Sequence, residues 1–343
     1  MLVRAVQNMK YYRRRSCERD AKGFSLIELM ISITIGLIMM VAVFSAYLGA
    51  STAGRVTEAQ GRMNEDAQTA LSVLTQQLRM AGNNPTQPDR TDKSRRNPAY
   101  NPYDTATFVN APASASPSSF SIRGCGRNFS NITSATRLDA LVCPNGNGYA
   151  ANSIAVSYEA DIFNSAPTTL GAPADCLGAA LTPTQVTFPA EDPSGPYFYS
   201  VAENRFYIDV SKANVPSLYC QGNGQNGTAQ PLVENIEDLQ FTYGVVKAST
   251  AAENIETASI SGYLRADEVT TNPALAALPD DSARWAKVVA VRICVLVRSE
   301  AAAATDLTSA RYTKCDGTVE NAPPDLRLRR AYNTTVVLRN RRL

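Results

Sequence analysis

A single carboxylate, Glu28, stands near the start of a long segment that is otherwise apolar or uncharged. No other charged residue occurs between Lys22 and Arg55, and the apolar part, Phe24 to Ala50, contains no proline. This part has roughly 27 residues, more than the ~20 that a helix needs to cross a bilayer. The sequence therefore predicts a membrane-spanning helix, which constrains everything that precedes and follows it.

The charges on the two sides of this segment differ in sign. Residues 1–23 contain seven Lys or Arg and two acids, a net charge of +5, whereas the whole chain carries +2. Residues 24–343 therefore carry a net charge of −3. The positive-inside rule places residues 1–23 in the cytoplasm and the residues after the apolar segment on the other side of the membrane. A cleaved secretory signal is the alternative, but such signals have a shorter apolar core, and "AYLGASTAG" is a weak cleavage site.

Glu28 needs more than a role in helix capping. The motif "SLIE" from Ser25 fits a capping box, and an acid in the first turn suits the helix dipole. However, a carboxylate in hydrocarbon costs about 2.5–3.5 kcal/mol, and a cap contributes only ~1 kcal/mol. A nearby cation would offset the difference, since an opposite charge at ~4 Å contributes ~4 kcal/mol at an effective dielectric of ~20. The new amino group of a chain cut just before Phe24 would supply that cation.

The stretch "KGFSLIELMISITIG" resembles the class III signal of type IV prepilins, in which a basic leader is followed by Gly, an aromatic residue and a Glu. The resemblance implies that prepilin peptidase removes residues 1–23 by cutting between Gly23 and Phe24, and that Phe24 is N-methylated. It also implies that Glu28 meets the Phe24 amine of a neighbouring subunit. The leader is long for such proteins, so translation from Met9 instead of Met1 stays open.

The helix is expected to continue beyond the membrane. From Val56 onward the apolar residues form one stripe at helical spacing, and the helix stops at Gly82 and Pro85: Val56, Ala59, Met63, Ala67, Ala70, Leu74, Leu78 and Ala81. We expect one helix over residues 24–81, with residues 24–50 in the membrane or filament core and residues 51–82 amphipathic. A globular head that covers the stripe is favoured, and a dimeric coiled coil is the alternative.

Residues 83–343 are expected to form a β-rich head. Residues 83–118 are expected to be a long loop, followed by strands at "SFSIR", "LDALV", "SIAVSYEA", "YFYSVAENRFYIDV" and "SLYC", with turns such as "NGNG" and "ENR". The strongest strands are Leu239–Val246, Lys287–Arg298 and Thr334–Arg339, each with an apolar face. The predicted fold is therefore α+β and pilin-like, a long N-terminal helix packed on an antiparallel sheet. The acids Glu234, Glu237 and Asp238 are expected on a solvated helix face or turn.

The cysteines fit an oxidising compartment. Cys17 lies in the leader, and six remain: Cys125, Cys143, Cys176, Cys220, Cys294 and Cys315. An even number predicts three disulfides, for which fifteen connectivities are possible. We favour sequential pairing, with modest loops of ~3 kcal/mol each in the entropy model. A metal site is disfavoured because the chain has no histidine and no C-x-x-C.

The sequence gives little support for catalysis or nucleotide binding. The absence of histidine removes the commonest general base, and no nucleophile motif is present. The stretch "GNGQNG", residues 222–227, matches a dinucleotide fingerprint, but Cys220 precedes it closely and Pro231 follows, so a loop is expected. We expect no enzyme activity, no cofactor and no nucleic-acid partner.

The C-terminal stretches "LVENIEDLQFTYGV", "AKVVAVRICVLVRS" and "LRLRRAYNTTVVLRN" resemble the C-terminal domain of the PilW family, about residues 231–343 here. These are large minor pilins. The resemblance implies a protein that primes type IV pilus assembly at the bacterial inner membrane and ends at the pilus tip. Its implied partners are prepilin peptidase, other minor pilins, the major pilin, the inner-membrane assembly platform and a large tip adhesin. The alternative is a pseudopilin of a type II secretion system, which shares the signal and the helix.

Overall fold

The computed structural model describes residues 23–85, 120–135, 137–145, 150–186, 197–225, 227–246, 259–278 and 280–340. The leader before Gly23 and most of the expected loop after Asn83 lie outside the described residues. The chain divides into two compact units, residues 1–54 and residues 55–343. Helix α1, Leu26–Met80, contributes to both of them.

Helix α1 begins and ends close to the residues expected from the sequence. It starts after Ser25, and no proline interrupts its 55 residues. At the other end Gly82 adopts a φ of 75°, a left-handed conformation that favours glycine and stops a helix. The Gly82 amide then donates to the Ser157 carbonyl at 2.9 Å, so the end of α1 is tied directly to the head.

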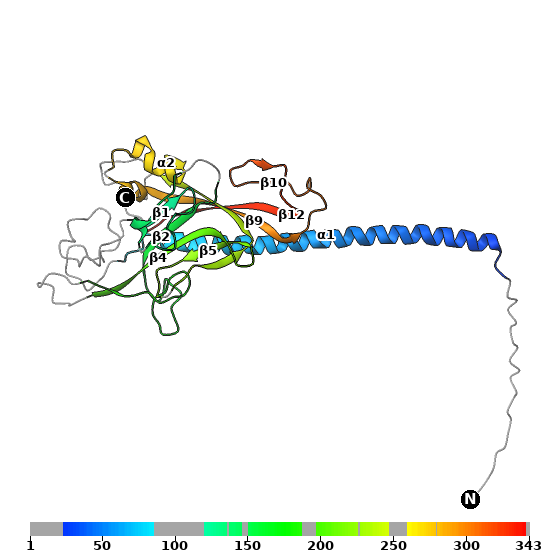
Figure 1. Cartoon of the computed structure of the whole chain (residues 1–343), viewed down its shortest axis with the longest axis horizontal. Helices are drawn as coiled ribbons and strands as arrows, with labels where there is room; N and C mark the ends of the chain where they lie inside the picture. Colours follow the sequence, from blue (N-terminus) through cyan, green and yellow to red (C-terminus); the bar gives the residue numbers. More distant parts are fainter. Residues whose placement is uncertain are drawn as a thin grey trace, which may run out of the picture. The chain divides into compact units, whose positions relative to one another are not determined.

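The head is built from two larger antiparallel sheets and a small hairpin (Figure 1). One sheet has the order β1-β2-β4-β5-β6, with β3 paired to β4: β1 Ile122–Cys125, β2 Ser153–Ala160, β3 Thr184–Val186, β4 Tyr197–Val210, β5 Pro216–Gln221 and β6 Gln230–Glu234. The other has the order β12-β9-β7-β8: β7 Ile236–Val245, β8 Gly262–Leu264, β9 Val288–Ala302 and β12 Arg327–Val337. The hairpin pairs β10 Tyr312–Thr313 with β11 Val319–Glu320. Short helical segments complete the head: η4 Leu138–Ala140, α2 Ala266–Thr271, η5 Pro273–Leu275 and α3 Asp281–Ala286.

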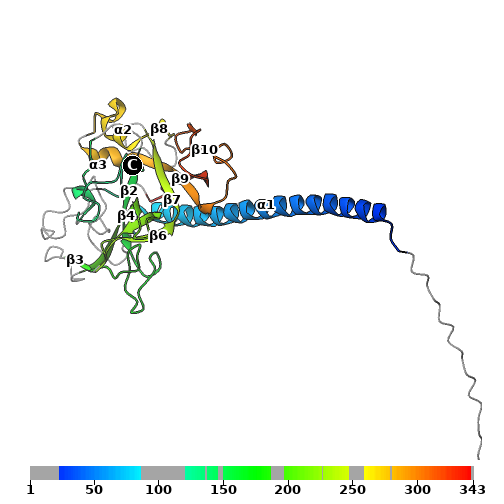
Figure 2. The same cartoon turned by 45° about the vertical axis from the view of Figure 1, so that its right-hand side comes forward.

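The apolar stripe of α1 is covered by the head. Six of its members are buried in one core with residues of both sheets: Met63, Ala67, Ala70, Leu74, Leu78 and Ala81. Val56 and Ala59 are half-buried. Both views show the strands gathered around the cyan second half of α1 (Figures 1 and 2). A buried Leu contributes about 1.5–3 kcal/mol, so the stripe anchors the helix, and the expectation of a covering sheet is confirmed.

The central strands carry the apolar face expected from the sequence, and much of the other face of β9 is buried as well. In β7 and β9, Phe241 lies opposite Ile293 and Tyr243 lies opposite Val291, and these four side chains are buried. Val336 of β12 lies opposite Val291 on its other side. Opposed residues share a face of the sheet, so the apolar face continues across all three strands.

Two local expectations were wrong. The "ENR" stretch, Glu203 to Arg205, forms no turn but lies in the middle of β4, where it pairs with Ala155–Ser157 of β2. It is flanked by strand-forming aromatic and β-branched residues and contains no Gly or Pro. The "LDALV" stretch forms no strand but the 3-10 turn η4. There the Asn131 side chain bonds the Ala140 carbonyl and the Val142 amide, which takes the place of a strand partner.

The structure joins the six head cysteines in sequential order. The pairs are Cys125–Cys143, Cys176–Cys220 and Cys294–Cys315, with Cα separations of 5.6, 6.5 and 5.7 Å. These separations lie in the range that disulfides require. The third bridge ties the segment between β9 and β12 to the middle of β9.

Candidate assembly site

Glu28 closes a capping box at the start of α1. The Ser25 hydroxyl oxygen accepts from the Glu28 amide at 3.2 Å, and the Glu28 carboxylate accepts from the Ser25 amide at 3.4 Å and from its hydroxyl at 3.5 Å. The capping geometry expected from the sequence is therefore present. The bonds to the carboxylate are long, and no ion pair of Glu28 occurs within the described residues.

Gly23 and Phe24 precede the helix and are fully accessible. Phe24 is 83% exposed. A Cβ added at Gly23 would meet nothing within 4 Å, and its φ is not in the left-handed region. The fold of this chain therefore imposes no glycine at position 23, so the requirement for one would have to come from an enzyme that binds the segment.

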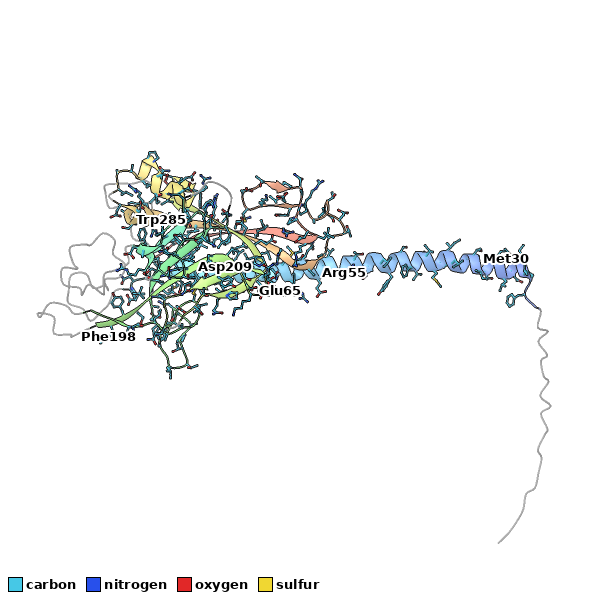
Figure 3. The ribbon with its side chains drawn as sticks, in the orientation of Figure 1. Met30, Arg55, Glu65, Phe198, Asp209 and Trp285 are labelled. Carbon is cyan, nitrogen blue, oxygen red and sulfur yellow. A yellow bond between two sulfur atoms is a disulfide. The ribbon has the colours of Figure 1, made fainter. Side chains whose placement is uncertain are left out.

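The first half of α1 presents apolar side chains on all sides. They point outward along the helix, as Met30 does in Figure 3. This is the helix among the described residues that is long and apolar enough to cross a membrane, and none of its most apolar window is buried. Contiguous exposed apolar surface of this size marks a membrane or protein interface. Glu28 is the single charge in this surface, so any charged contact made there must use it.

The acids expected on a helix face or turn lie in strands instead. Glu234 is exposed at the end of β6, and Asp238 is buried in β7, where it accepts from the Leu239 amide at 2.8 Å. Glu237 binds the guanidinium of Arg329 in β12 through two bonds of 2.6 and 2.9 Å. The turn is confined to Asn235, with a φ of 62°. Because the three acids are close together in sequence, the pattern did not indicate that they belong to two strands, β6 and β7, separated by a single residue.

Arg329 is the centre of a charged cluster under the β10–β11 hairpin. It also binds Asp325 at 2.7 Å, and its side chain is 2% exposed. Burial alone would lower the pKa of Arg329, but hydrogen bonds to Asp325 and Glu237 raise it above its usual value. The bond from Arg329 in turn lowers the pKa of the Asp325 carboxyl. The two acids share one buried cation, which is an arrangement that holds strands together.

A second buried pair lies on β4. Glu203 and Arg205 are two residues apart on one face of the strand, with 4.0 Å between the Glu203 carboxylate and the Arg205 guanidinium. Burial raises the pKa of Glu203 to about 7 and lowers the pKa of Arg205. Sequence reasoning missed this pair because these residues were expected in a turn. The aromatic and β-branched residues of β4 on either side of them were the signal that could have indicated it.

The glycine-rich stretch after β5 encloses a carboxylate of the chain itself. The Gly224 amide donates to Asp175 at 2.9 Å, and the amides of Leu177 and Ala179 donate to the other oxygen of Asp175. An added Cβ at Gly222 would overlap the Asp175 carboxyl group, and one at Gly224 would lie 2.7 Å from an Asp175 carboxylate oxygen. The glycines thus allow close approach to Asp175, and the expectation of a loop is confirmed.

Comparison with known proteins gives two family matches. The family described as Type IV Pilus-assembly protein W matches residues 205–340, from the middle of β4 to three residues beyond the end of β12. The Prokaryotic N-terminal methylation motif matches residues 19–44, which include Gly23, Phe24 and Glu28. No curated protein and no solved structure matches the chain.

Proposed function

We propose that this chain, a type IV pilus protein of the PilW family with a prepilin methylation motif, is a minor pilin that primes pilus assembly and then caps the pilus tip. The observation that carries the proposal is the exposed apolar half of α1 with Glu28 as its single charge. Such a surface needs lipid before assembly and neighbouring helices after it. The motif and this helix fit single-pass anchoring in the inner membrane with a periplasmic head.

The proposed first step is processing. Prepilin peptidase cuts between Gly23 and Phe24 and methylates the new amine of Phe24. Both residues precede α1 and are exposed, so an enzyme can reach them without unfolding the helix.

The proposed second step pairs charges between chains. The Glu28 carboxylate of one subunit meets the Phe24 amine of its neighbour. The weak bonds from Ser25 leave the carboxylate able to accept stronger ones. Because both groups lie in an apolar environment, either one left alone costs several kcal/mol. The pairing therefore aligns neighbouring helices in one axial position.

A place at the tip follows from the size of the head. Residues 83–343 are bulky for a subunit that repeats along a thin fibre, whereas a large head is readily accommodated at an end. Other minor pilins, the major pilin, the assembly platform and a tip adhesin are the proposed partners. The match to a pilus-assembly family favours this role over that of a type II secretion pseudopilin.

Glu28→Gln tests the central step. Glutamine also completes a capping box, so the variant should be inserted and cleaved, yet loss of the charge should lower pilus yield tens- to thousands-fold at ~1.4 kcal/mol per decade. Ser25→Ala is the control, because it removes the capping hydroxyl and keeps the carboxylate. Sheared-pilus yield and membrane-fraction processing are measured together. Normal yield in the Glu28→Gln variant would reduce Glu28 to a helix cap.

The tip position and the choice of machinery have separate tests. Immunogold labelling of the head on isolated pili should mark fibre ends, and labelling along the shaft would refute a cap. Deleting the gene should abolish piliation and spare type II secretion. The reverse result would identify a pseudopilin.

A further inference from the structure

We propose that the free edge of β12 is a docking site for an extended strand of a different protein, uncharged at its centre and with a carboxylate near each end. β12 is the last strand of its sheet, and β9 is the one strand paired with it in the described part of the chain. No loop or turn among the described residues bonds the backbone of residues 331–337 on the other side. The edge therefore offers unused amide and carbonyl groups to an added strand.

β12 differs from the other sheet edges of the described chain. Edge strands are usually kept short or interrupted, because long ones pair with other chains. β1 has four residues and β8 has three, while β6 has five and includes Pro231. β12 has 11 residues and no proline. Among the strands at the ends of the two larger sheets, β12 is thus the one without this protection, and the branch strand β3 has only three residues.

The composition of this edge also favours pairing. The stretch "AYNTTVV", residues 331–337, has no charge, no Gly and no Pro, and four of its seven residues are β-branched. Such stretches form strands readily. Asn333, Thr335 and Val337 are exposed on the outer face of the sheet, and Val337 is 56% exposed. On the inner face the Tyr332 hydroxyl bonds Asn64 of α1, so the helix covers that face.

The charges at the two ends of residues 331–337 determine which kind of strand can bind this edge. Arg330 and Arg339 are both exposed, and neither forms an ion pair with an acid in the described residues. In contrast, Arg327 and Arg329 are paired with Asp325. A second copy paired antiparallel about Thr334 would place Arg339 of each copy opposite Arg329 and next to Arg330 of the other, and like charges there are unfavourable. A different strand with a carboxylate near each end would be complementary.

The test tethers a candidate strand to the full-length chain in detergent. The peptide Glu-Thr-Val-Thr-Val-Thr-Val-Glu is joined after Leu343 through about ten Gly and Ser residues, which holds it near the edge at roughly millimolar effective concentration. Hydrogen exchange followed by mass spectrometry reports the amides of residues 331–337. Those facing the free edge should exchange ~100-fold more slowly than in the untethered chain, because they gain strand bonds.

Controls separate strand addition from other contacts. A tethered peptide with Lys at both ends should protect the amides up to ~10-fold less, since two charge pairs change from attractive to repulsive. Val337→Lys should abolish protection, whereas Val319→Lys, at a Val that is 55% exposed on β11, should leave it unchanged. Unslowed exchange, equal protection by both peptides, or equal loss in both variants would overturn the proposal. Slow exchange in the untethered chain that depends on its concentration would instead assign the edge to a second copy.

Discussion

Gly124→Ala is expected to destabilise the head, because Gly124 lies where its two sheets meet. Gly124 is in β1 of the first sheet, and the side chain nearest to it is Tyr243 from β7 of the second. An added Cβ would overlap the Tyr243 hydroxyl and lie 2.5 Å from ring carbon Cζ and 3.0 Å from Trp285. Contacts this short cannot be kept, so either a ring or the strand must move.

Neither the Tyr243 ring nor strand β1 can move easily. Tyr243 is fully buried and packs edge-on against the Trp285 ring, with 4.8 Å between centroids. β1 is held by its pairing with β2 and by the Cys125–Cys143 bridge. Overpacking of this kind costs about 1–3 kcal/mol, and replacing a strand glycine returns about 0.5–1 kcal/mol of backbone entropy. The expected net loss is about 1–2 kcal/mol, or roughly 2–8 °C in Tm at ~2–4 °C per kcal/mol for a large domain.

Thermal and urea unfolding of the full chain in detergent would measure this loss. Gly126→Ala is the matched control, because a Cβ there meets nothing within 4 Å. Tyr243→Phe alone should be neutral or stabilising, since the buried hydroxyl has no hydrogen-bond partner among the described residues. When Tyr243→Phe is combined with Gly124→Ala, it should restore part of the stability that Gly124→Ala removes. If Gly124→Ala matched the Gly126→Ala control, this account of how the sheets pack would be refuted.

Three further predictions concern charge, redox state and processing. Burial raises the pKa of Glu203 to about 7, so the contribution of its protonated carboxyl to stability is full below about pH 4.5 and is lost as the pH rises through 7. The free energy of unfolding should therefore fall by ~3 kcal/mol more between pH 4 and pH 8 in the wild type than in the Glu203→Gln variant. Parallel pH profiles of the two proteins would contradict this. Non-reducing peptide mapping should find the three sequential disulfides, and two or more reduced thiols among the six head cysteines would argue against them. Mass spectrometry should find N-methylated Phe24, whereas Gly23→Ala should retain the leader; a mature end near Gly54 would point to a secretory signal instead.

Sequence reasoning succeeded where one periodicity extended over many residues. The stripe from Met63 to Leu78 repeats at helical spacing for more than four turns, and one face of β9 has a β-branched residue at every second position from Val289 to Val297, so local irregularities could not mask either pattern. The same holds for the helix end, where Gly82 and Pro85 act together. Long patterns are reliable because each repeat adds independent evidence for the same burial direction.

It failed where a local motif competed with tertiary pairing. Polar residues in a row suggested a turn at Glu203–Arg205, yet β2 and the strand-forming neighbours keep β4 extended. Glu237 likewise seemed solvated, because its partner Arg329 is 92 residues away in sequence. Single-sequence patterns carry no information about contacts at that separation. Glu28 could be singled out from the sequence because the cost of burying its charge depends on the local apolar run alone, and its role in assembly stays a prediction.

The interface between α1 and the head also shows why its stripe alone would not define a unique packing. Side chains that are not branched at Cβ, such as Ala67, Ala70 and Leu74, pack at similar cost after a shift of one helical turn. Polar bonds remove that freedom: Gln77 accepts from the buried Asn204 amide at 2.7 Å, and Asn64 accepts from the Tyr332 hydroxyl. A shift of one turn would break both bonds and leave the buried Asn204 amide with only its long 3.4 Å bond to the Tyr158 hydroxyl, at about 1–3 kcal/mol. The apolar stripe therefore supplies most of the stability of this packing, and the polar bonds determine its register.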